Sequence, residues 1–181
     1  MKSNGRTKSP DATDLVKGLA AGLIGGLVAS WTMNQFQALA AKLTEEMEKS
    51  QGGKKKQPAT QKEGDDATVK AASEISEGVF DHKLTKSEKK IAGPAVHYAM
   101  GATSGAFYGA LAELVPTVTL GAGLPFGTAV WLIADEAALP ALGLAKSPTE
   151  IPFSTHAYAL GSHFVYGLTT EIVRKSIRGA P

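Results

Sequence analysis

The chain has 181 residues, a length that suits one domain. Its 19 basic side chains nearly balance its 17 acidic ones, so no overall charge recruits nucleic acid, and the absence of cysteine excludes disulfides and thiolate chemistry. The charges are segregated: residues 44–91 hold most of them, whereas residues 92–173 hold very few. The near-neutral average therefore conceals long apolar segments.

The N-terminus joins a polar tail to an apolar run. Residues 1–14 are polar and basic, and the apolar run begins at Leu15. A signal peptide is the alternative interpretation, but the run lacks a short apolar core followed by a clear small-x-small cleavage site. We predict a retained first membrane helix over residues 15–43, capped by Asp14.

Small residues recur every fourth position in this helix and again in a later run. That stride keeps them on one helix face, where another backbone can approach closely, as in small-xxx-small membrane helix pairs. Glycine inside a helix costs about 1 kcal/mol relative to alanine, which disfavours the alternative of a buried hairpin in a soluble all-α domain. The predicted helix-packing residues are Gly18, Gly22, Gly26, Ser30, Gly101, Gly105 and Gly109.

A polar insertion over residues 44–91 follows the first helix. Residues 51–58 have the composition of a solvated linker. Apolar side chains at helical spacing within residues 66–80 predict a short amphipathic helix on the membrane or on the bundle. Thr85 and Glu88 have the spacing of a capping box, which predicts the start of the next helix.

Three further membrane helices are expected at about residues 95–115, 118–139 and 153–173, each close to the roughly 20 residues that a bilayer requires. Pro125 is expected to kink the third. The predicted fold class is all-α: a four-helix transmembrane bundle within a single membrane domain, residues 15–178, whose polar loop carries the short amphipathic helix.

The sequence suggests an internal duplication. Tyr108-Gly and Tyr166-Gly each precede a glutamate, Glu113 and Glu171, and the first and third helices also resemble each other. Two helical hairpins of the same orientation would be related by an axis along the membrane normal. Chance similarity among Gly/Ala-rich helices is the alternative.

Polar side chains on the helices define a candidate site. In the hairpin arrangement, most of them meet near one membrane boundary and Glu171 lies at the other. His163 lies about 10 Å deeper than His156 at 1.5 Å per residue, and an ionisable group at that depth is a functional candidate. The candidate polar or proton site comprises Asn34, His97, Asp135, Glu136, His156, His163 and Glu171.

Three kinds of chemistry fit these residues. A metal site could use the histidines and carboxylates, but no local signature such as H-E-x-x-H supports one, and we expect no metal. A proton path could use Asp135, His163 and Glu171, because histidine titrates near neutral pH. The third possibility is structural: the groups cap helices and hydrogen-bond across the bundle. With no phosphate loop or nucleophile elbow, we expect neither an enzyme nor a cofactor.

The closing segment, Thr170 to Arg178, follows an aromatic helix and resembles the YagU-like bacterial inner-membrane family, a domain of unknown function. His97 leading a Gly-rich helix to Glu113, and Pro140 with Gly143 after a Gly-Ala-Gly run, fit the same pattern. The resemblance implies a multi-pass protein of the bacterial inner membrane with a loose association with acid tolerance. It brings no set of catalytic residues.

The expected function is that of a structural or accessory subunit that packs through its glycine-lined helix faces. Its expected partners are the lipid bilayer and a second copy or a larger membrane complex, without nucleic acid. The alternative is a proton- or ion-handling membrane protein. Lysines in residues 44–91 favour a cytoplasmic loop, whereas the tail's resemblance favours cytoplasmic termini.

Overall fold

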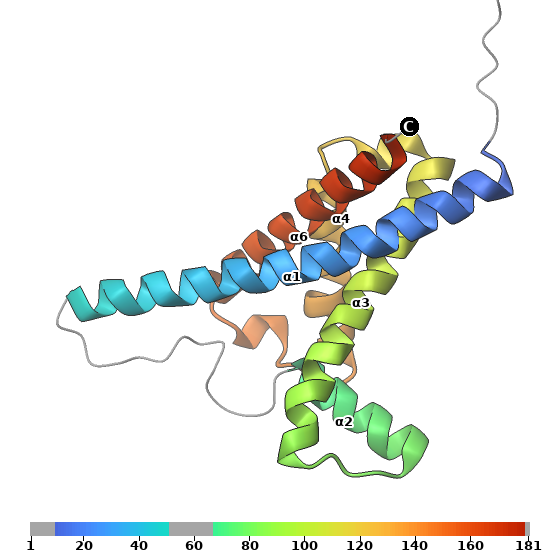
Figure 1. Ribbon diagram of the computed structural model, residues 1–181. Helices are drawn as coiled ribbons and strands as arrows, with labels where there is room; N and C mark the ends of the chain where they lie inside the picture. Colours follow the sequence, from blue (N-terminus) through green and yellow to red (C-terminus); the bar gives the residue numbers. More distant parts are fainter. Residues whose placement is uncertain (1–9, 51–66, 180–181) are drawn as a thin grey trace, which may run out of the picture.

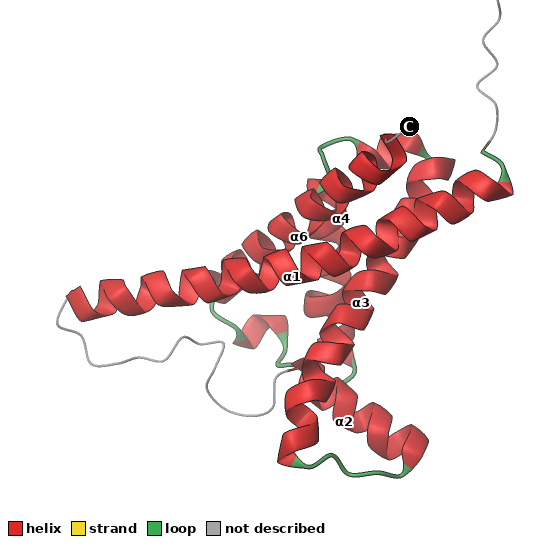
Figure 2. Ribbon diagram, viewed as in Figure 1, coloured by secondary structure: helices red, strands yellow, loops and turns green. Residues whose placement is uncertain are grey.

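Every regular element in the described part of the chain is helical, as predicted (Figures 1 and 2). The computed structural model describes residues 10–50 and 67–179. Most of the predicted N-terminal tail and the predicted linker over residues 51–58 lie outside these ranges.

The longest helix is α1, Ala12–Ser50. It is capped by Asp11 rather than by Asp14, because Asp11 Oδ1 accepts a hydrogen bond from the Asp14 N–H at 2.9 Å. Its end continues past the predicted boundary, since the charged residues there are good helix formers. Within the described residues it is the only helix long and apolar enough to cross a membrane, over Ala12–Met47.

The polar insertion ends in two helices that pack together. The predicted amphipathic helix is present as α2, Ala67–Phe80, and it lies on α3, Lys86–Leu114 (Figure 1). The predicted capping box is confirmed: Glu88 Oε2 accepts from the Thr85 N–H at 2.7 Å, and Thr85 Oγ1 accepts from the Glu88 N–H at 3.3 Å.

The third predicted helix is broken into pieces. A 3-10 turn, η1 (Pro116–Thr119), precedes α4 (Leu124–Trp131), a π-helix, η2 (Leu132–Ala138), and the short α5 (Leu139–Ala141). Pro125 does not kink a helix, contrary to our expectation. It lies in the first turn of α4, where its missing N–H would have no helical partner anyway.

The last long helix is α6, Phe153–Gly179, preceded by the 3-10 turn η3, Pro148–Glu150. It packs against both α1 and α4, while α1 also crosses α3 (Figure 1). The long helices thus meet around α1, whose C-terminal part extends beyond them (Figure 1).

Glycine rows lie where the helices cross. A Cβ added at Gly22 of α1 would overlap the Gly105 carbonyl oxygen of α3, and one at Gly26 would overlap the Gly101 carbonyl oxygen. The same relation joins α4 to α6, since a Cβ at Gly127 would overlap the His163 carbonyl oxygen. The rows predicted for helix packing therefore face each other within the chain.

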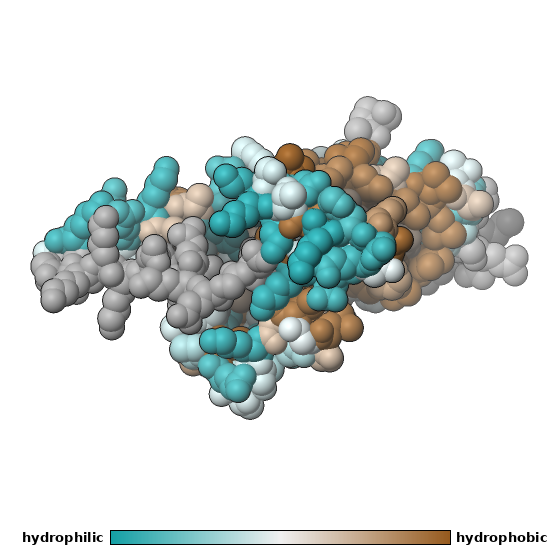
Figure 3. Space-filling model, turned by 90° about the horizontal axis from the view of Figure 1, so that it is seen from below, coloured by the Kyte–Doolittle hydropathy of each residue, from teal (hydrophilic) through white to brown (hydrophobic). Residues whose placement is uncertain are grey.

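The distribution of side chains is the reverse of that in a water-soluble domain. The interior holds small residues, two tyrosines and several polar groups, among them His163, Thr170, Glu171 and Arg174. Large apolar side chains such as Phe107 are instead exposed. Figure 3 shows such residues gathered over one side of the molecule, beside a hydrophilic region.

Candidate functional site

The π-helix η2 directs two consecutive carboxylates towards α6. Glu136 Oε1 lies 2.6 Å from His156 Nδ1, and the other ring nitrogen, Nε2, lies 3.0 Å from the Pro148 carbonyl oxygen. Only 18% of each of the two side chains is exposed. η2 is a run of i→i+5 hydrogen bonds, as in the Leu139 N–H bond to the Ala134 carbonyl. Such segments often mark functional sites.

The geometry fixes the number of protons in this pair. A backbone carbonyl only accepts, so His156 Nε2 must carry a hydrogen. The 2.6 Å contact on the opposite side also needs a hydrogen, on either His156 Nδ1 or Glu136 Oε1. With these hydrogen bonds, the His156–Glu136 pair carries two hydrogens on its ring nitrogens and carboxylate. A neutral imidazole next to an ionised carboxylate would carry one.

A second carboxylate–histidine pair lies deeper along α6. Asp135 Oδ2 is 3.7 Å from His163 Nδ1, which donates to the Ala159 carbonyl oxygen at 2.9 Å. The side chain of His163 is 9% exposed and that of Asp135 is 33% exposed. In the neutral ring, Nε2 is then the nitrogen that can accept a proton.

A second polar cluster lies towards the other end of α6. Arg174 donates from Nε and Nη2 to the Glu171 carboxylate at 2.7 and 2.9 Å, and the Tyr108 hydroxyl donates to the same carboxylate at 3.0 Å. All three side chains are buried. Breaking such a buried pair costs about 3–5 kcal/mol, because one charge is left uncompensated.

Arg178 connects three helices at this end. Its guanidinium donates to both Glu113 oxygens of α3, at 2.7 and 3.0 Å, and to Asp14 of α1 at 3.3 Å. Arg174 also lies 3.9 Å from Glu113. Glu113 and Glu171 thus share one group of arginines.

Aromatic rings separate the two polar clusters. The Tyr108 and Phe126 rings stack with centroids 4.2 Å apart, and Phe126 lies 5.7 Å from the Tyr166 ring. Tyr166 lies 6.5 Å from the His163 ring, and its hydroxyl donates to the Gly101 carbonyl at 2.7 Å. This aromatic layer would hinder the passage of ions between the clusters.

The structure brings only some of the predicted residues together. Asp135 and Glu136 meet His163 and His156, whereas Glu171 belongs to the arginine cluster. Asn34 lies 3.5 Å from the Tyr98 hydroxyl, against whose ring His97 packs edge-on. The residues described include no group of three or more His, Asp or Glu side chains arranged to hold a metal ion.

Sequence reasoning missed the π-helix and the role of Tyr108. No residue pattern distinguishes seven π-helical residues from an ordinary helix. For Tyr108 a signal existed, because the repeated Tyr-Gly pattern marks it as one of a matched pair with Tyr166. Its contact with Glu171 crosses from one predicted hairpin to the other.

Over residues 10–50 and 67–179 the protein is all-helical, with one helix long and apolar enough to cross a membrane. Residues 71–172 match a family described as Protein of unknown function (DUF1440), and because the match covers more than half of the chain, the protein belongs to that family. No curated protein and no solved structure matches it. The matched range contains both carboxylate–histidine pairs and excludes α1.

Proposed function

We propose that this protein is a multi-pass membrane protein that binds and transfers protons through the carboxylate–histidine pairs of η2 and α6. The membrane part rests on the reversed distribution of side chains. Apolar residues such as Leu23, Phe107 and Ile133 are exposed, while Glu171 and Arg174 are buried. In water such an apolar surface would favour aggregation. In a bilayer the same surface would contact the apolar lipid chains.

Helix length supports several crossings. α3 has 29 residues and α6 has 27, so each exceeds the roughly 20 residues that span a hydrocarbon core. The broken run from α4 to α5 would cross as a discontinuous helix, with α4 packed against α6. The YagU-like resemblance favours the bacterial inner membrane with cytoplasmic termini, whereas the lysines of residues 44–91 favour a cytoplasmic loop.

Matching contacts support two hairpin repeats. Gly18 of α1 approaches Gly109 and Glu113 of α3, just as Gly123 of α4 approaches Gly167 and Glu171 of α6. This correspondence gives a new alignment of the first and third helices, in which Gly18 matches Gly123. In the new alignment Ser30 takes the place of Asp135, so the ionisable pairs belong to the second hairpin alone.

The proton part rests on one observation: the Glu136–His156 contact accommodates a proton that can reside on either partner. Histidine exchanges protons near neutral pH. Asp135 is adjacent to Glu136 in the sequence, and its carboxylate contacts His163, which lies deeper in the bundle than His156. Proton uptake at these pairs would fit the association with acid tolerance that the resemblance implies.

The test is proton flux in reconstituted vesicles that contain a pH-sensitive dye. We expect a pH-dependent flux that weakens in His163→Ala and in Glu136→Gln. His82→Ala is a matched control, because His82 is an exposed residue between α2 and α3. Flux no greater than in empty vesicles would refute the proposal, as would equal loss in the control.

A second function, that of an accessory subunit, has support from α1. Its C-terminal part extends beyond the bundle and exposes Leu39, Leu43 and Met47 at four-residue intervals. A partner helix would pack there rather than on the glycine rows, which already face each other. Native mass measurements in mild detergent would test this: Leu39→Ser with Leu43→Ser should reduce the assembled mass, and a monomeric wild type would exclude it.

A further inference from the structure

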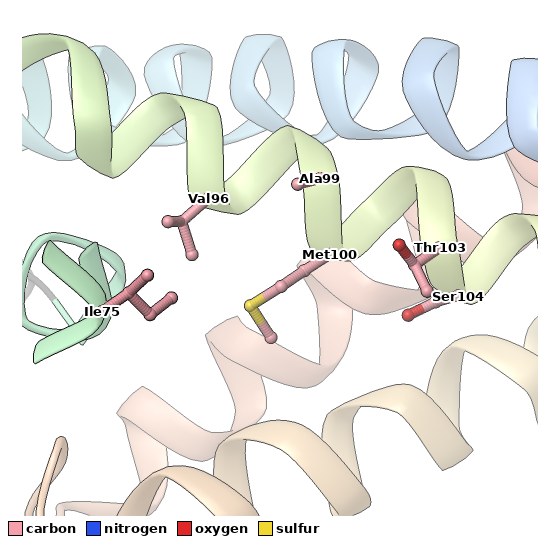
Figure 4. Close-up of a pocket in the computed structure, with 6 residues that line it drawn as sticks. All are labelled: Ile75, Val96, Ala99, Met100, Thr103 and Ser104. Atoms are coloured by element: carbon pink, nitrogen blue, oxygen red, sulfur yellow. The ribbon is translucent and has the colours of Figure 1, made fainter. Parts of the chain in front are cut away.

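A shallow apolar groove lies where α2 meets the surface of α3. Ile75 of α2 points towards α3, whose lining residues lie within about two and a half helical turns (Figure 4). The α3 residues that line the groove are Val96, Ala99, Met100, Thr103 and Ser104. Phe107, exposed and one turn beyond Thr103, continues the same helix face towards the bundle.

A second set of exposed apolar side chains, which we call the apolar rim, lies at the end of α2 and in the first turns of α3. Val79 and Phe80 at the end of α2 are 70% and 72% exposed, and Ile91 in α3 is 74% exposed. These residues lie in the polar insertion, where water would be the expected solvent. So much exposed apolar surface at the end of an amphipathic helix is typical of helices that lie in the interface of a bilayer.

Lysines cluster next to this surface at the start of α3, whereas α2 carries one lysine and two glutamates. Lys86, Lys89 and Lys90 all lie in the first five residues of α3, although cations are unfavourable at the N-terminus of a helix. Glu88, the acidic residue among them, is engaged in the capping box. Lys89 precedes Val96 by seven residues, so it lies on the groove face about 10 Å before it. Basic residues next to an apolar surface attract anionic lipid headgroups.

We propose that the groove and its apolar rim dock onto an anionic phospholipid of the bilayer. One acyl chain lies against Val96 and Met100, and the phosphate lies at the level of Lys86 and Lys90. Phe80 and Ile91 enter the interfacial layer beside it. This arrangement fixes the depth of α3: residues from about 95 onwards lie in hydrocarbon, and residues 86–91 lie among headgroups. The inference rests on the membrane location proposed above, but not on proton transfer.

The experiment uses the absence of cysteine in the natural chain, which allows one fluorophore per protein. Phe80→Cys labels the rim, Glu77→Cys labels an exposed polar position on the same helix, and Phe107→Cys labels the expected span. Each labelled full-length chain is reconstituted in vesicles of phosphatidylcholine with phosphatidylglycerol, and either lipid carries a bromine quencher.

Brominated phosphatidylglycerol should quench the Phe80 probe at least twice as strongly as brominated phosphatidylcholine at equal content. Aqueous iodide should quench only the Glu77 probe. Lys86→Ser with Lys90→Ser should bring the lipid preference towards one. The control variant, Lys42→Ser with Lys146→Ser, also removes two lysines, but at exposed positions away from the groove. It should leave the preference for phosphatidylglycerol unchanged.

The three probes separate the possible failures. If the probe at position 80 lies in water while the probe at position 107 lies in lipid, the docking proposal is wrong. The proposed membrane location would still hold. A Phe107 probe in water would overturn the membrane location itself. Equal quenching by the two lipids, or equal effects of the two lysine pairs, would overturn the recognition of anionic lipid.

Discussion

His156 and Glu136 face each other across 2.6 Å, and the far nitrogen of the imidazole is held 3.0 Å from the Pro148 carbonyl. Both ring nitrogens therefore point at oxygen atoms that accept hydrogen bonds. This contact joins a π-helix to the first turn of α6.

The first prediction concerns the shared proton. In Glu136→Gln, the His156 ring loses the carboxylate that offsets its charge, while Pro148 still requires a hydrogen on Nε2. We expect the variant ring to be a neutral Nε2–H tautomer near pH 7, with one proton fewer bound per chain than in the wild-type pair. Nitrogen NMR of labelled histidine in detergent distinguishes the two states. A doubly protonated ring in the variant would contradict the proton count.

The second prediction concerns the glycine rows. In Gly22→Ala, the new methyl group would meet the Gly105 carbonyl and the Gly109 Cα, and backbone cannot move aside as a side chain can. We expect a loss of about 1–3 kcal/mol in the free energy of unfolding. Denaturation in detergent measures it.

Gly161→Ala in α6 is the matched control, because nothing lies within 4 Å of the added Cβ. It should be neutral or gain about 0.5–1 kcal/mol from the lower helix cost of alanine. Equal effects of the two substitutions would show that the α1–α3 contact does not depend on close backbone approach.

Local signals predicted most of the helices, and tertiary contacts decided the rest. The capping box from Thr85 to Glu88 is a four-residue pattern that needs no distant partner, so the sequence located the start of α3 correctly. The π-helix is different. η2 reaches α6 through the side chains of Asp135 and Glu136, and the residues of Leu132–Ala138 would suit an ordinary helix equally well.

The candidate site was predictable as a set of residues but not as a set of pairs. Helix order placed the carboxylates late in one helix and the histidines early in the next. The one-residue offset that assigns Glu136 to His156 and Asp135 to His163 depends on the π-helical register. The repeated Tyr-Gly pattern marked Tyr108, but an aromatic residue in an apolar helix carries no sign of a buried carboxylate partner.

The third prediction is a pH dependence in the insertion. Hydrogen bonds from the Thr85 backbone and hydroxyl, with a further one from His82, lower the pKa of Glu88. A carboxyl whose pKa is lowered on folding stabilises the fold above its unfolded pKa, about 4.3 for Glu, and that contribution is lost as the pH falls through the folded value.

We therefore expect the first turn of α3 to fray in acid while the rest of α3 stays protected. Amide hydrogen exchange at Glu88 and its neighbours, measured between pH 7 and pH 3 with correction for intrinsic rates, tests this. Glu88→Gln should remove the pH dependence of the turn. An unchanged dependence in that variant would assign it to another group.

The fourth prediction concerns Arg178, which holds α6 to α3 and α1 at once. Its two hydrogen bonds to Glu113 are bidentate, at 2.7 and 3.0 Å, and hydrogen bonds to a charged partner are worth about 1.5–3 kcal/mol each when buried. The side chain of Arg178 is 24% exposed and that of Glu113 15%, so solvent screening reduces this contribution.

We expect Arg178→Gln to lower the free energy of unfolding by about 1–3 kcal/mol and to increase hydrogen exchange at the C-terminal ends of α3 and α6. Arg178→Lys should restore only part of the loss, since an ammonium group cannot bond both Glu113 oxygens and Asp14 in the same geometry. Lys175→Gln, an exposed cation on the same helix end, is the control and should change stability by less than about 0.5 kcal/mol. If Lys175→Gln cost as much as Arg178→Gln, the effect would be one of net charge, and the three-helix contact would contribute nothing of its own.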